Sequence, residues 1–489
     1  MPGIPGTGTL RPTDNIAAEI LTLIELPAGL VIMGVNSDDG FRTTAGDPQD
    51  PCAALVLGEF DGGRPPGDTL FAFTVQEPGV YPFRTIWEEG GGGSSLEWFT
   101  VQPDGSRILV NDVAHGGLRG WRPASPPPTP ANEVVLTARC VTSAQDIEMA
   151  IERATAHGTR PGVVTLDAAE GEFRYRGDDR EIDIQRPEVT LRSLNGAVLP
   201  DCATGVVLGG PAAVNVVIEG LTFVCEFRGL DIREDKPHQG AVLRHNRFRT
   251  TDSGIMGRGV TGWTIEGNTI EAGSWRSAVG LDNATAVRVS SNRLVGGDGV
   301  LHLVDVRDAE LNDNEVIAAD FSAIVLIGVS ATQVSGNSVA APVWGMVVID
   351  SEAAGVQIVN NAVTMPPGSA DAISVSRSSG VKLVNNDILS SSLGIHFFES
   401  HDCEAVNNVT RGGWEGILVG HGGCGHKIVN NQIHGVWSGG LSFEGANFNN
   451  QVTANRVWCT SPGTCELIKA ADGADFYRNN QVRANRLIR

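Results

Sequence analysis

The chain has 489 residues, including 61 glycines and 25 prolines, and only 19% of them are charged, so it is neither a coiled coil nor a highly charged disordered polymer. Its 57 acidic residues outnumber its 36 lysines and arginines. The formal net charge of −21 argues against nucleic acid as a partner, because phosphate backbones attract clustered positive charge. No run of eighteen apolar residues occurs, so we expect no membrane insertion.

Residues 1–121 are predicted to form a β-sandwich. Short apolar stretches such as LVIMGV, TLFAFTV, LEWFTV and RILV alternate with turns rich in glycine and proline. The segment RPASPPPTPAN, residues 122–132, has five prolines in eleven residues and cannot form a central strand or a helix. We therefore predict a linker at 122–132 and a second domain at 133–489.

Two segments of the first domain, VNSDDGFRTTAG and GVYPFRTIWEEGGGGSSLEWF, resemble the β-sandwich first named from anthrax protective antigen and shared by flocculin-type adhesins and some glycosidases. In sugar-binding members of that family, two aspartates joined by a cis peptide hold Ca²⁺. Asp38 and Asp39 match this pair, and paired carboxylates suit a hard cation. The domain lacks the family's usual N-terminal strands, and Asp-Asp-Gly is also a common turn sequence.

The segment TSAQDIEMAIERATAHG, which follows the linker, predicts one amphipathic helix. Thr142 and Gln145 are placed as a capping box and Gly158 as the stop. Ile147 and Ile151 fall on one face with alanines, so this face is expected to cover an apolar surface.

From about residue 211 the chain repeats, most visibly at an asparagine that ends one short apolar strand and precedes another. The aligned residues are Asn246, Asn268, Asn292, Asn314, Asn337, Asn361, Asn386, Asn408, Asn431, Asn455 and Asn485. A period of about 23 residues indicates a stacked solenoid. We expect the asparagines to adopt the left-handed backbone of a sharp turn and to pass amide hydrogen bonds between turns.

Residues 140–489 resemble the right-handed parallel β-helix repeat proteins of the pectate-lyase-like superfamily. The opening helix and the following VVTLDAAEGEFRYRG match the way such proteins begin, with a helix that plugs the N-terminal end of the solenoid. The predicted fold class is therefore all-β, a right-handed parallel β-helix with an N-terminal capping helix, preceded by a β-sandwich.

Aligning the strands of the form Gly-Ile-x-Leu-x on their following asparagine predicts two columns of outward side chains, since the inside of the solenoid is filled. One column contains Met256, Gly280, His302, Val325, Val347, Ser374, His396, Leu418 and Ser442. The other contains Arg258, Asp282, Val304, Ile327, Ile349, Ser376, Phe398, Gly420 and Glu444. The aliphatic residues at 325, 327, 347 and 349 form an outward apolar belt, which implies a cover: the sandwich, a long loop or another subunit.

Two polar groups flank this belt. Arg258, Asp282, His302 and Asp305 form the first, and Arg377, His396, Glu399, His401, His421 and Glu444 form the second. Either could hold a polysaccharide, with His396, Glu399, His421 and Glu444 as candidate acids or bases and Arg258, Asp282, His302, Asp305 and Arg377 as candidate binding residues. The alternative is a solvated face with incidental ion pairs. The sequence has no Walker loop or Rossmann fingerprint, so we expect no organic cofactor.

Cysteine placement suggests disulfides. Cys459 and Cys465 bracket a short loop, and Cys202 with Cys225 and Cys403 with Cys424 are each about one repeat apart. Cys52 and Cys140 have no obvious partner. Bridges would imply an oxidising compartment, although eight reduced and buried cysteines are the alternative.

Two functions remain open from the sequence. The first is an extracellular or cell-surface protein, without a visible signal peptide, that binds a polysaccharide or cell-surface glycan and as an enzyme would be a hydrolase or lyase. A net charge of −21 favours a neutral glycan. The second is a non-enzymatic structural, adhesion or fibre protein, with the β-helix as a rigid scaffold and the apolar belt as a homo-oligomer interface.

Overall fold

The computed structural model describes residues 16–46, 54–122, 132–156, 161–175, 179–209, 213–232, 238–349, 355–390, 392–460, 463, 465–471 and 473–488. The chain divides into two compact units, residues 1–131 and 132–489. The predicted linker at 122–132 falls almost wholly outside the described residues. None of the helices in the described parts is long and apolar enough to cross a membrane.

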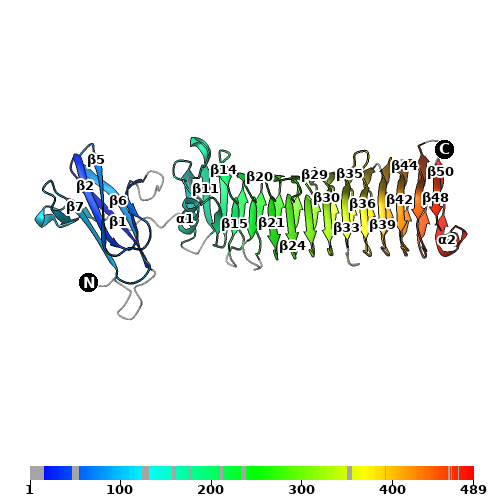
Figure 1. The fold of residues 1–489 in the computed structure, drawn as a ribbon, viewed down its shortest axis with the longest axis horizontal. Helices are drawn as coiled ribbons and strands as arrows, with labels where there is room; N and C mark the ends of the chain where they lie inside the picture. The colour runs from blue at the N-terminus through cyan, green and yellow to red at the C-terminus, as the bar shows by residue number, and fades with distance from the viewer. Residues whose placement is uncertain are drawn as a thin grey trace. The chain divides into compact units, whose positions relative to one another are not determined.

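The first unit is a β-sandwich of two antiparallel sheets (Figure 1). One sheet has the order β4-β3-β6-β1-β9 and the other β5-β2-β7-β8. Alternate strand residues such as Met33, Val35 and Phe83 fill the core between the sheets. The strands are β1 Ile16–Leu26, β2 Gly29–Asp38, β3 Phe41–Ala45, β4 Leu55–Phe60, β5 Gly67–Val75, β6 Gly79–Glu89, β7 Ser95–Val101, β8 Arg107–Leu109 and β9 Gly120–Trp121, with a 3₁₀ turn at Val113–His115.

The second unit is a parallel β-solenoid of about 12 turns with about 24 residues per turn, close to the predicted period of 23 (Figure 1). Each turn contributes one strand to each of three parallel sheets, in the order sheet I, sheet III, sheet II along the chain. Leucine, isoleucine and valine side chains from all three sheets are fully buried inside the coil. The predicted fold class is confirmed.

Sheet I contains β10 Glu133–Thr137, β11 Gly162–Asp167, β13 Val189–Leu194, β16 Val217–Glu219, β19 Val242–Arg244, β22 Thr264–Glu266, β25 Arg288–Ser290, β28 Glu310–Asn312, β31 Gln333–Ser335, β34 Gln357–Val359, β37 Lys382–Val384, β40 Glu404–Val406, β43 Lys427–Val429, β46 Gln451–Thr453 and β49 Gln481–Arg483. Sheet II contains β12 Ile182–Ile184, β15 Val206–Leu208, β18 Leu230–Ile232, β21 Ile255–Arg258, β24 Val279–Asp282, β27 Leu301–Val304, β30 Ser322–Ile327, β33 Trp344–Ile349, β36 Asp371–Ser376, β39 Leu393–Phe398, β42 Glu415–Gly420, β45 Gly439–Phe443 and β48 Glu466–Ala470. Sheet III contains β14 Val198–Cys202, β17 Thr222–Cys225, β20 Arg247–Thr250, β23 Thr269–Glu271, β26 Arg293–Gly296, β29 Glu315–Ala318, β32 Ser338–Ala340, β35 Ala362–Thr364, β38 Asp387–Leu389, β41 Val409–Arg411, β44 Gln432–Val436, β47 Arg456–Cys459 and β50 Arg486–Ile488.

The predicted asparagine ladder is present between sheets I and III. In a typical step, Oδ1 of Asn361 accepts hydrogen bonds from the backbone N–H and the Nδ2 group of Asn337, at 2.9 Å each. Asn361 in turn donates from Nδ2 to Oδ1 of Asn386, at 3.1 Å. The ladder residues from Asn246 to Asn455 are at most 2% exposed, so each buried amide is satisfied by its neighbours in the stack.

The backbone role expected of these asparagines is wrong. Positive φ angles occur at the residue before the ladder position, for example 58° at Asn360 and 56° at Asn385, and not at Asn361 or Asn386. The preceding residue makes the turn, which leaves the ladder side chain free to point inward and bond along the stack.

Helix α1, Ala144–Thr155, packs on β10, β11 and β12 at the start of the solenoid, as predicted. It buries Ile147 and Ile151 together with Ala150 and Ala154. The capping box is formed by Ser143 and Asp146 and not by Thr142 and Gln145, because the first helical turn begins one residue later than the sequence suggested. The predicted stop, Gly158, lies outside the described residues. A short helix α2, Ala474–Asn479, lies near the other end, and a 3₁₀ turn spans Ala168–Glu170.

The cysteines follow the prediction in part. Cys202–Cys225 and Cys459–Cys465 are disulfides. Cys140 also takes part in a disulfide, and Cys52 lies outside the described residues. The pairing of Cys403 with Cys424 is wrong: both are free thiols, because the register places Cys424 beside His401 and His426 beside Cys403.

Candidate functional site

The outward side chains of sheet II form columns along the solenoid. The strand register pairs Met256 with Gly280, Gly280 with His302, and so on through Ser374, His396 and Leu418 to Ser442. The same pairings stack Arg258 on Asp282 and Phe398 on Gly420. Residues about 24 apart in sequence are therefore direct neighbours at a strand spacing of about 4.8 Å.

The first polar group is brought together only in part. Arg258 and Asp282 form an exposed ion pair, with Nε and Oδ2 3.3 Å apart. His302 lies on the next turn, half-buried, and burial lowers the pKa of its imidazole, while the charges of Asp298 and Asp282 oppose this shift. Asp305 is exposed after its strand, and among the described residues it makes no ion pair with the other three.

A hollow of about 340 Å³ lies beside His302 on sheet II. Its wall consists of three aromatic side chains from three different turns. The Trp275 and Phe321 ring centroids are 6.4 Å apart, and the Phe321 and Trp344 rings meet edge-to-face at 4.6 Å. Asp298 lies at its rim, where Oδ1 accepts a hydrogen bond from the backbone N–H of Ser322.

The apolar belt predicted from the sequence is the floor of this hollow. Val325, Ile327, Val347 and Ile349 all line it, two from each of the neighbouring strands β30 and β33. The aromatic side chains of the chain's own turns thus cover part of the belt.

The aromatic wall belongs to a longer row, which we call the aromatic edge. Its members all lie where the chain passes from sheet III into sheet II, and they are Phe227, Trp275, Phe321, Trp344, Trp414 and Trp437. Trp275, Trp414 and Trp437 are 66%, 58% and 56% exposed, which is unusual for tryptophan on a folded protein. Trp414 and Trp437 lie on adjacent turns, since Ser438 donates a backbone hydrogen bond to the Trp414 carbonyl.

In the second polar group, His396 is the residue held most firmly. Its Nδ1 atom is 2.8 Å from Oδ2 of Asp371 on the preceding turn, and both side chains are more than four-fifths buried. His421 is exposed, and its ring packs against Phe398. Glu399 and Glu444 are exposed beyond the ends of β39 and β45.

Two further members of this group are exposed. His401 is exposed, with Nδ1 3.1 Å from Sγ of Cys424. Arg377 is exposed just after β36. The structure therefore gathers His396 and His421 around Phe398, but it does not gather all six predicted residues.

The sequence analysis did not single out a second buried carboxylate near this group. Glu415 is 5% exposed and lies in the same column as Asp371, two turns further along. Lys469 Nζ is 3.4 Å from Oε1 of Glu415 and 3.1 Å from the Ser438 hydroxyl. This contact neutralises a buried charge and is best understood as structural.

In the sandwich, Asp38, Asp39 and Glu89 place one carboxylate oxygen each within 4.8 Å of one another. The Asp38–Asp39 peptide is cis. The backbone N–H groups of Gly90 and Arg64 donate to Asp39 and lower its pKa, whereas burial and the nearby Asp39 raise the pKa of Asp38. Asp38 and Glu89 are 7% and 2% exposed, so three carboxylates, two of them buried, fit a hard divalent cation.

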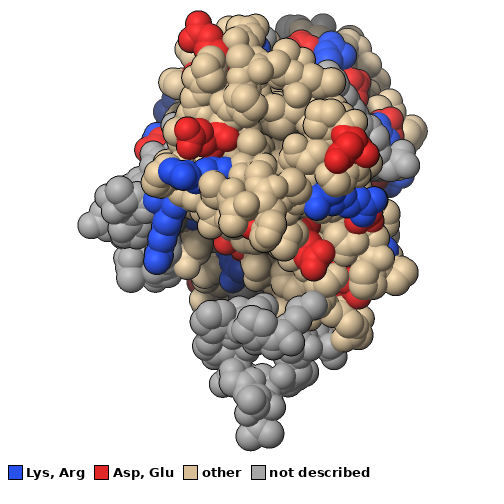
Figure 2. Space-filling view, turned by 90° about the vertical axis from the view of Figure 1, so that its left-hand side faces the viewer, with Lys and Arg blue, Asp and Glu red and all other residues tan. Residues whose placement is uncertain are grey.

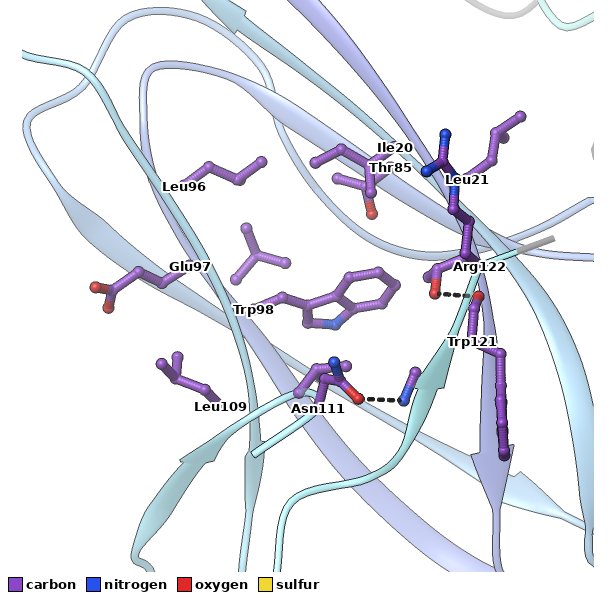
Figure 3. Close-up of a pocket in the computed structure, with 14 residues that line it drawn as sticks. Ile20, Leu21, Thr85, Leu96, Glu97, Trp98, Leu109, Asn111, Trp121 and Arg122 are labelled. Carbon is purple, nitrogen blue, oxygen red and sulfur yellow. Dashed lines mark hydrogen bonds between the residues drawn. The ribbon is translucent and has the colours of Figure 1, made fainter. Parts of the chain in front are cut away.

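Another cavity of the sandwich, about 490 Å³, opens between the two sheets around Trp98 (Figure 3). Its lining is mostly apolar, and the polar groups of Thr22 and Asn111 are already bonded to the backbone of Trp121 and Gly120. On the face shown in Figure 2, acidic and basic side chains are interspersed among uncharged residues, without a large basic patch.

A repeat alignment that included aromatic residues could have revealed the aromatic edge, because each member lies between the end of a sheet III strand and the first residue of the sheet II strand that follows. Asp371 and Glu415 belong to one column of stacked positions on sheet II. This column lies three positions before the column that contains His396 and Leu418. Only the two columns centred on the Gly-Ile-x-Leu-x strands were considered, so these carboxylates were missed.

The protein is a β-helix, as the stacked turns, the asparagine ladder and the helical plug show. Its candidate site residues in the solenoid lie on or beside sheet II. The family model described as the right handed beta helix region matches residues 193–363 and 298–457. Together these ranges cover more than half of the chain. The protein therefore belongs to the right-handed β-helix family, and the predicted resemblance is confirmed.

No protein with a curated description matches the sequence. Among solved structures, the chain is similar to the A-module of the Azotobacter vinelandii mannuronan C-5 epimerase AlgE6, with 13% identity, 71% of this chain and 96% of that chain covered, and a TM-score of 0.39. It is also similar to the catalytic domain of a GH87 alpha-1,3-glucanase in complex with nigerose, with 10% identity, 97% of this chain and 92% of that chain covered, and a TM-score of 0.38. A third similar structure is the DFA-IIIase of Arthrobacter chlorophenolicus A6 in complex with DFA-III, with 12% identity, 72% of this chain and 98% of that chain covered, and a TM-score of 0.44. All three TM-scores are below 0.5, and we draw no function from them.

Proposed function

We propose that this protein binds an elongated, neutral polysaccharide along sheet II of its solenoid. The aromatic edge is the observation that carries the proposal. Between Trp275 and Trp437 the row extends over seven turns, or roughly 34 Å at a strand spacing of about 4.8 Å. A linear ligand can follow such a row, whereas a small molecule would need only one part of it.

The chemistry of the row suits sugar rings. A pyranose ring has apolar C–H faces and a rim of hydroxyl groups, so it packs on exposed tryptophan and hydrogen-bonds at its edges. The hollow at Trp275, Phe321 and Trp344 supplies the apolar surface, and Asp298 with the Arg258–Asp282 pair supplies polar groups nearby. The net charge of −21 disfavours an acidic polymer.

Disulfides such as Cys202–Cys225 persist in oxidising compartments, which supports a role outside the cell.

The acidic site of the sandwich, Asp38, Asp39 and Glu89, is suited to Ca²⁺, which would make this unit a second, cation-dependent glycan contact. Chelation of Ca²⁺ should then weaken only the part of glycan binding that the sandwich contributes, because the aromatic edge needs no metal.

Alanine at both Trp275 and Trp344 is expected to weaken polysaccharide binding by at least about 30-fold. Truncation of one central aromatic anchor costs on the order of 2 kcal/mol, which is about 30-fold, and the double variant should lose at least this much. Affinity electrophoresis in gels containing glucomannan, xylan, β-glucan or dextran measures the effect, with EDTA in a parallel series.

Tyr477→Ala is the matched control, because Tyr477 is a 54% exposed aromatic residue outside the aromatic edge. It should bind like the wild type. Equal retardation of the double tryptophan variant and the wild type in every gel would contradict the proposal.

A further inference from the structure

The imidazole of His396 is held in one orientation. Nδ1 contacts Asp371, so the proton of neutral His396 lies on Nδ1 and the lone pair is on Nε2. Among the described residues, Nε2 makes no hydrogen bond. A buried carboxylate that fixes one nitrogen and leaves the other available is the arrangement of a general base.

The space next to Nε2 is open because of a glycine. Gly420 occupies the neighbouring position on the following turn, and a Cβ atom there would lie 3.3 Å from His396 Nε2 and 3.9 Å from the Phe398 ring. Any other residue would place its side chain where a substrate atom must approach. Leu418, paired with His396 in the register, adds an apolar wall.

A second imidazole packs on the same phenylalanine. His421 directly follows Gly420, and its ring packs against Phe398 with centroids 4.8 Å apart. His396 packs edge-to-face against the same Phe398 ring at 5.8 Å. Two histidines thus contact one aromatic ring, one fixed by a carboxylate and one exposed.

We propose that the side chains around Phe398 form a catalytic site for hydrolysis of acyl esters on the bound glycan, with His396 as general base, His421 as general acid and Asp371 as positioning residue. The inference rests on the proposed glycan-binding function, which it deepens. His396 Nε2 removes a proton from water, and the water oxygen forms a bond to the ester carbonyl carbon. The bond from that carbon to the sugar oxygen then breaks, and His421 donates a proton to the leaving oxygen. The products are a carboxylic acid and a sugar hydroxyl, and solvent returns the proton from His396 to His421.

The groups around His396 and Phe398 favour an ester over a glycosidic bond. Hydrolysis of glycosides commonly uses two carboxyl groups facing each other across the bond. Here Asp371 is engaged by His396 and Glu415 by Lys469, while Glu399 and Glu444 are exposed beyond the strand ends. Phe398 and Leu418 provide an apolar surface for an acyl methyl group.

The test measures acetate and new reducing ends released from acetylated glucomannan and acetylated xylan, together with hydrolysis of p-nitrophenyl acetate. The wild type should release acetate without new reducing ends. His396→Ala should lower kcat at least about 100-fold, the usual contribution of a positioned acid or base. Gly420→Ala, which adds only a methyl group beside Nε2, should lower kcat about tenfold or more. The control His245→Ala, an exposed histidine away from sheet II, should leave the rate unchanged.

Asp371→Asn should lower kcat and leave KM nearly unchanged, because it disturbs the imidazole and not the sugar contacts. The wild-type rate should fall on both sides of a pH optimum, because the base must be unprotonated and the acid protonated. The ionisable groups on the strands that pack against β39 are Asp371 on the preceding turn and Glu415 on the following turn, with His421 directly after that turn's strand. His421→Ala should remove the alkaline limb of this profile, since that limb reflects loss of the acid's proton.

Affinity electrophoresis of the same variants separates the two proposals. Wild-type protein that binds these polymers but releases no acetate would overturn the catalytic site and leave glycan binding intact. Release of reducing ends instead of acetate, or a wild-type rate in His396→Ala, would also overturn it. A variant that binds as well as the wild type is folded, so its loss of rate reports on chemistry.

Discussion

Replacing Asn361 with alanine is expected to lower the free energy of unfolding of the solenoid by at least about 2 kcal/mol. The substitution leaves the buried backbone N–H of Asn337 without its acceptor. It also removes one of two hydrogen bonds at Asn337 Nδ2 and at Asn386 Oδ1, and the bond to the Val334 carbonyl. A buried polar group left unsatisfied costs about 1–3 kcal/mol, and a lost hydrogen bond costs about 0.5–1.5 kcal/mol. Urea unfolding followed by circular dichroism measures the change.

Gln357→Ala is the control, since Gln357 is exposed on strand β34 of the same turn. It should change stability by less than about 0.5 kcal/mol. Because each turn of a solenoid contacts only its neighbours, Asn361→Ala should also broaden the transition. Similar stability of the two variants would show that the ladder adds little to the stacking of the turns.

The second large effect expected is stabilisation of the sandwich by Ca²⁺. After chelation, Ca²⁺ at a hundred times its dissociation constant should add about 2.7 kcal/mol to the stability of this unit. For a unit of this size the melting temperature should then rise by about 10 °C. The physical reason is relief of repulsion among Asp38, Asp39 and Glu89, two of which are buried.

Calorimetry of the intact protein with and without Ca²⁺ measures this shift. Glu89→Gln should abolish most of it, because the third carboxylate is lost while the shape of the side chain is kept. Glu88→Gln alters the exposed neighbouring residue and should keep the full shift. A Glu89→Gln protein that responds to Ca²⁺ like the wild type would show that these carboxylates do not bind the ion.

The architecture could be predicted because the repeat period of the solenoid is visible in the sequence. Asn361 and its counterparts recur at the same point of successive turns from Asn246 onward, so the register of sheet II followed from alignment alone, down to the stacking of His396 on Ser374. The helical plug followed from the apolar face of α1. Buried apolar residues recur at fixed spacings along a strand, a helix or a repeat, so their pattern can be recognised in the sequence itself.

The contacts that define the candidate sites had no such signal. The Asp371–His396 contact depends on a column that lies outside the repeated motif, and Glu89 joins Asp38 only because β6 and β2 belong to facing sheets of one sandwich. The expected Cys403–Cys424 bridge failed for a related reason. A shift of two residues within a turn moves a thiol to a different column, although the separation in sequence still matches one repeat.

Hydroxyl-radical footprinting of the intact protein, with and without a polysaccharide that retards it in gels, shows whether sheet II and its aromatic edge bind a glycan. Trp275, Trp344, Trp414 and Trp437 should be protected by the polymer, and the labelling of Tyr477 should stay unchanged. Protection confined to the sandwich, or equal labelling of these tryptophans with and without the bound polymer, would contradict binding by the aromatic edge.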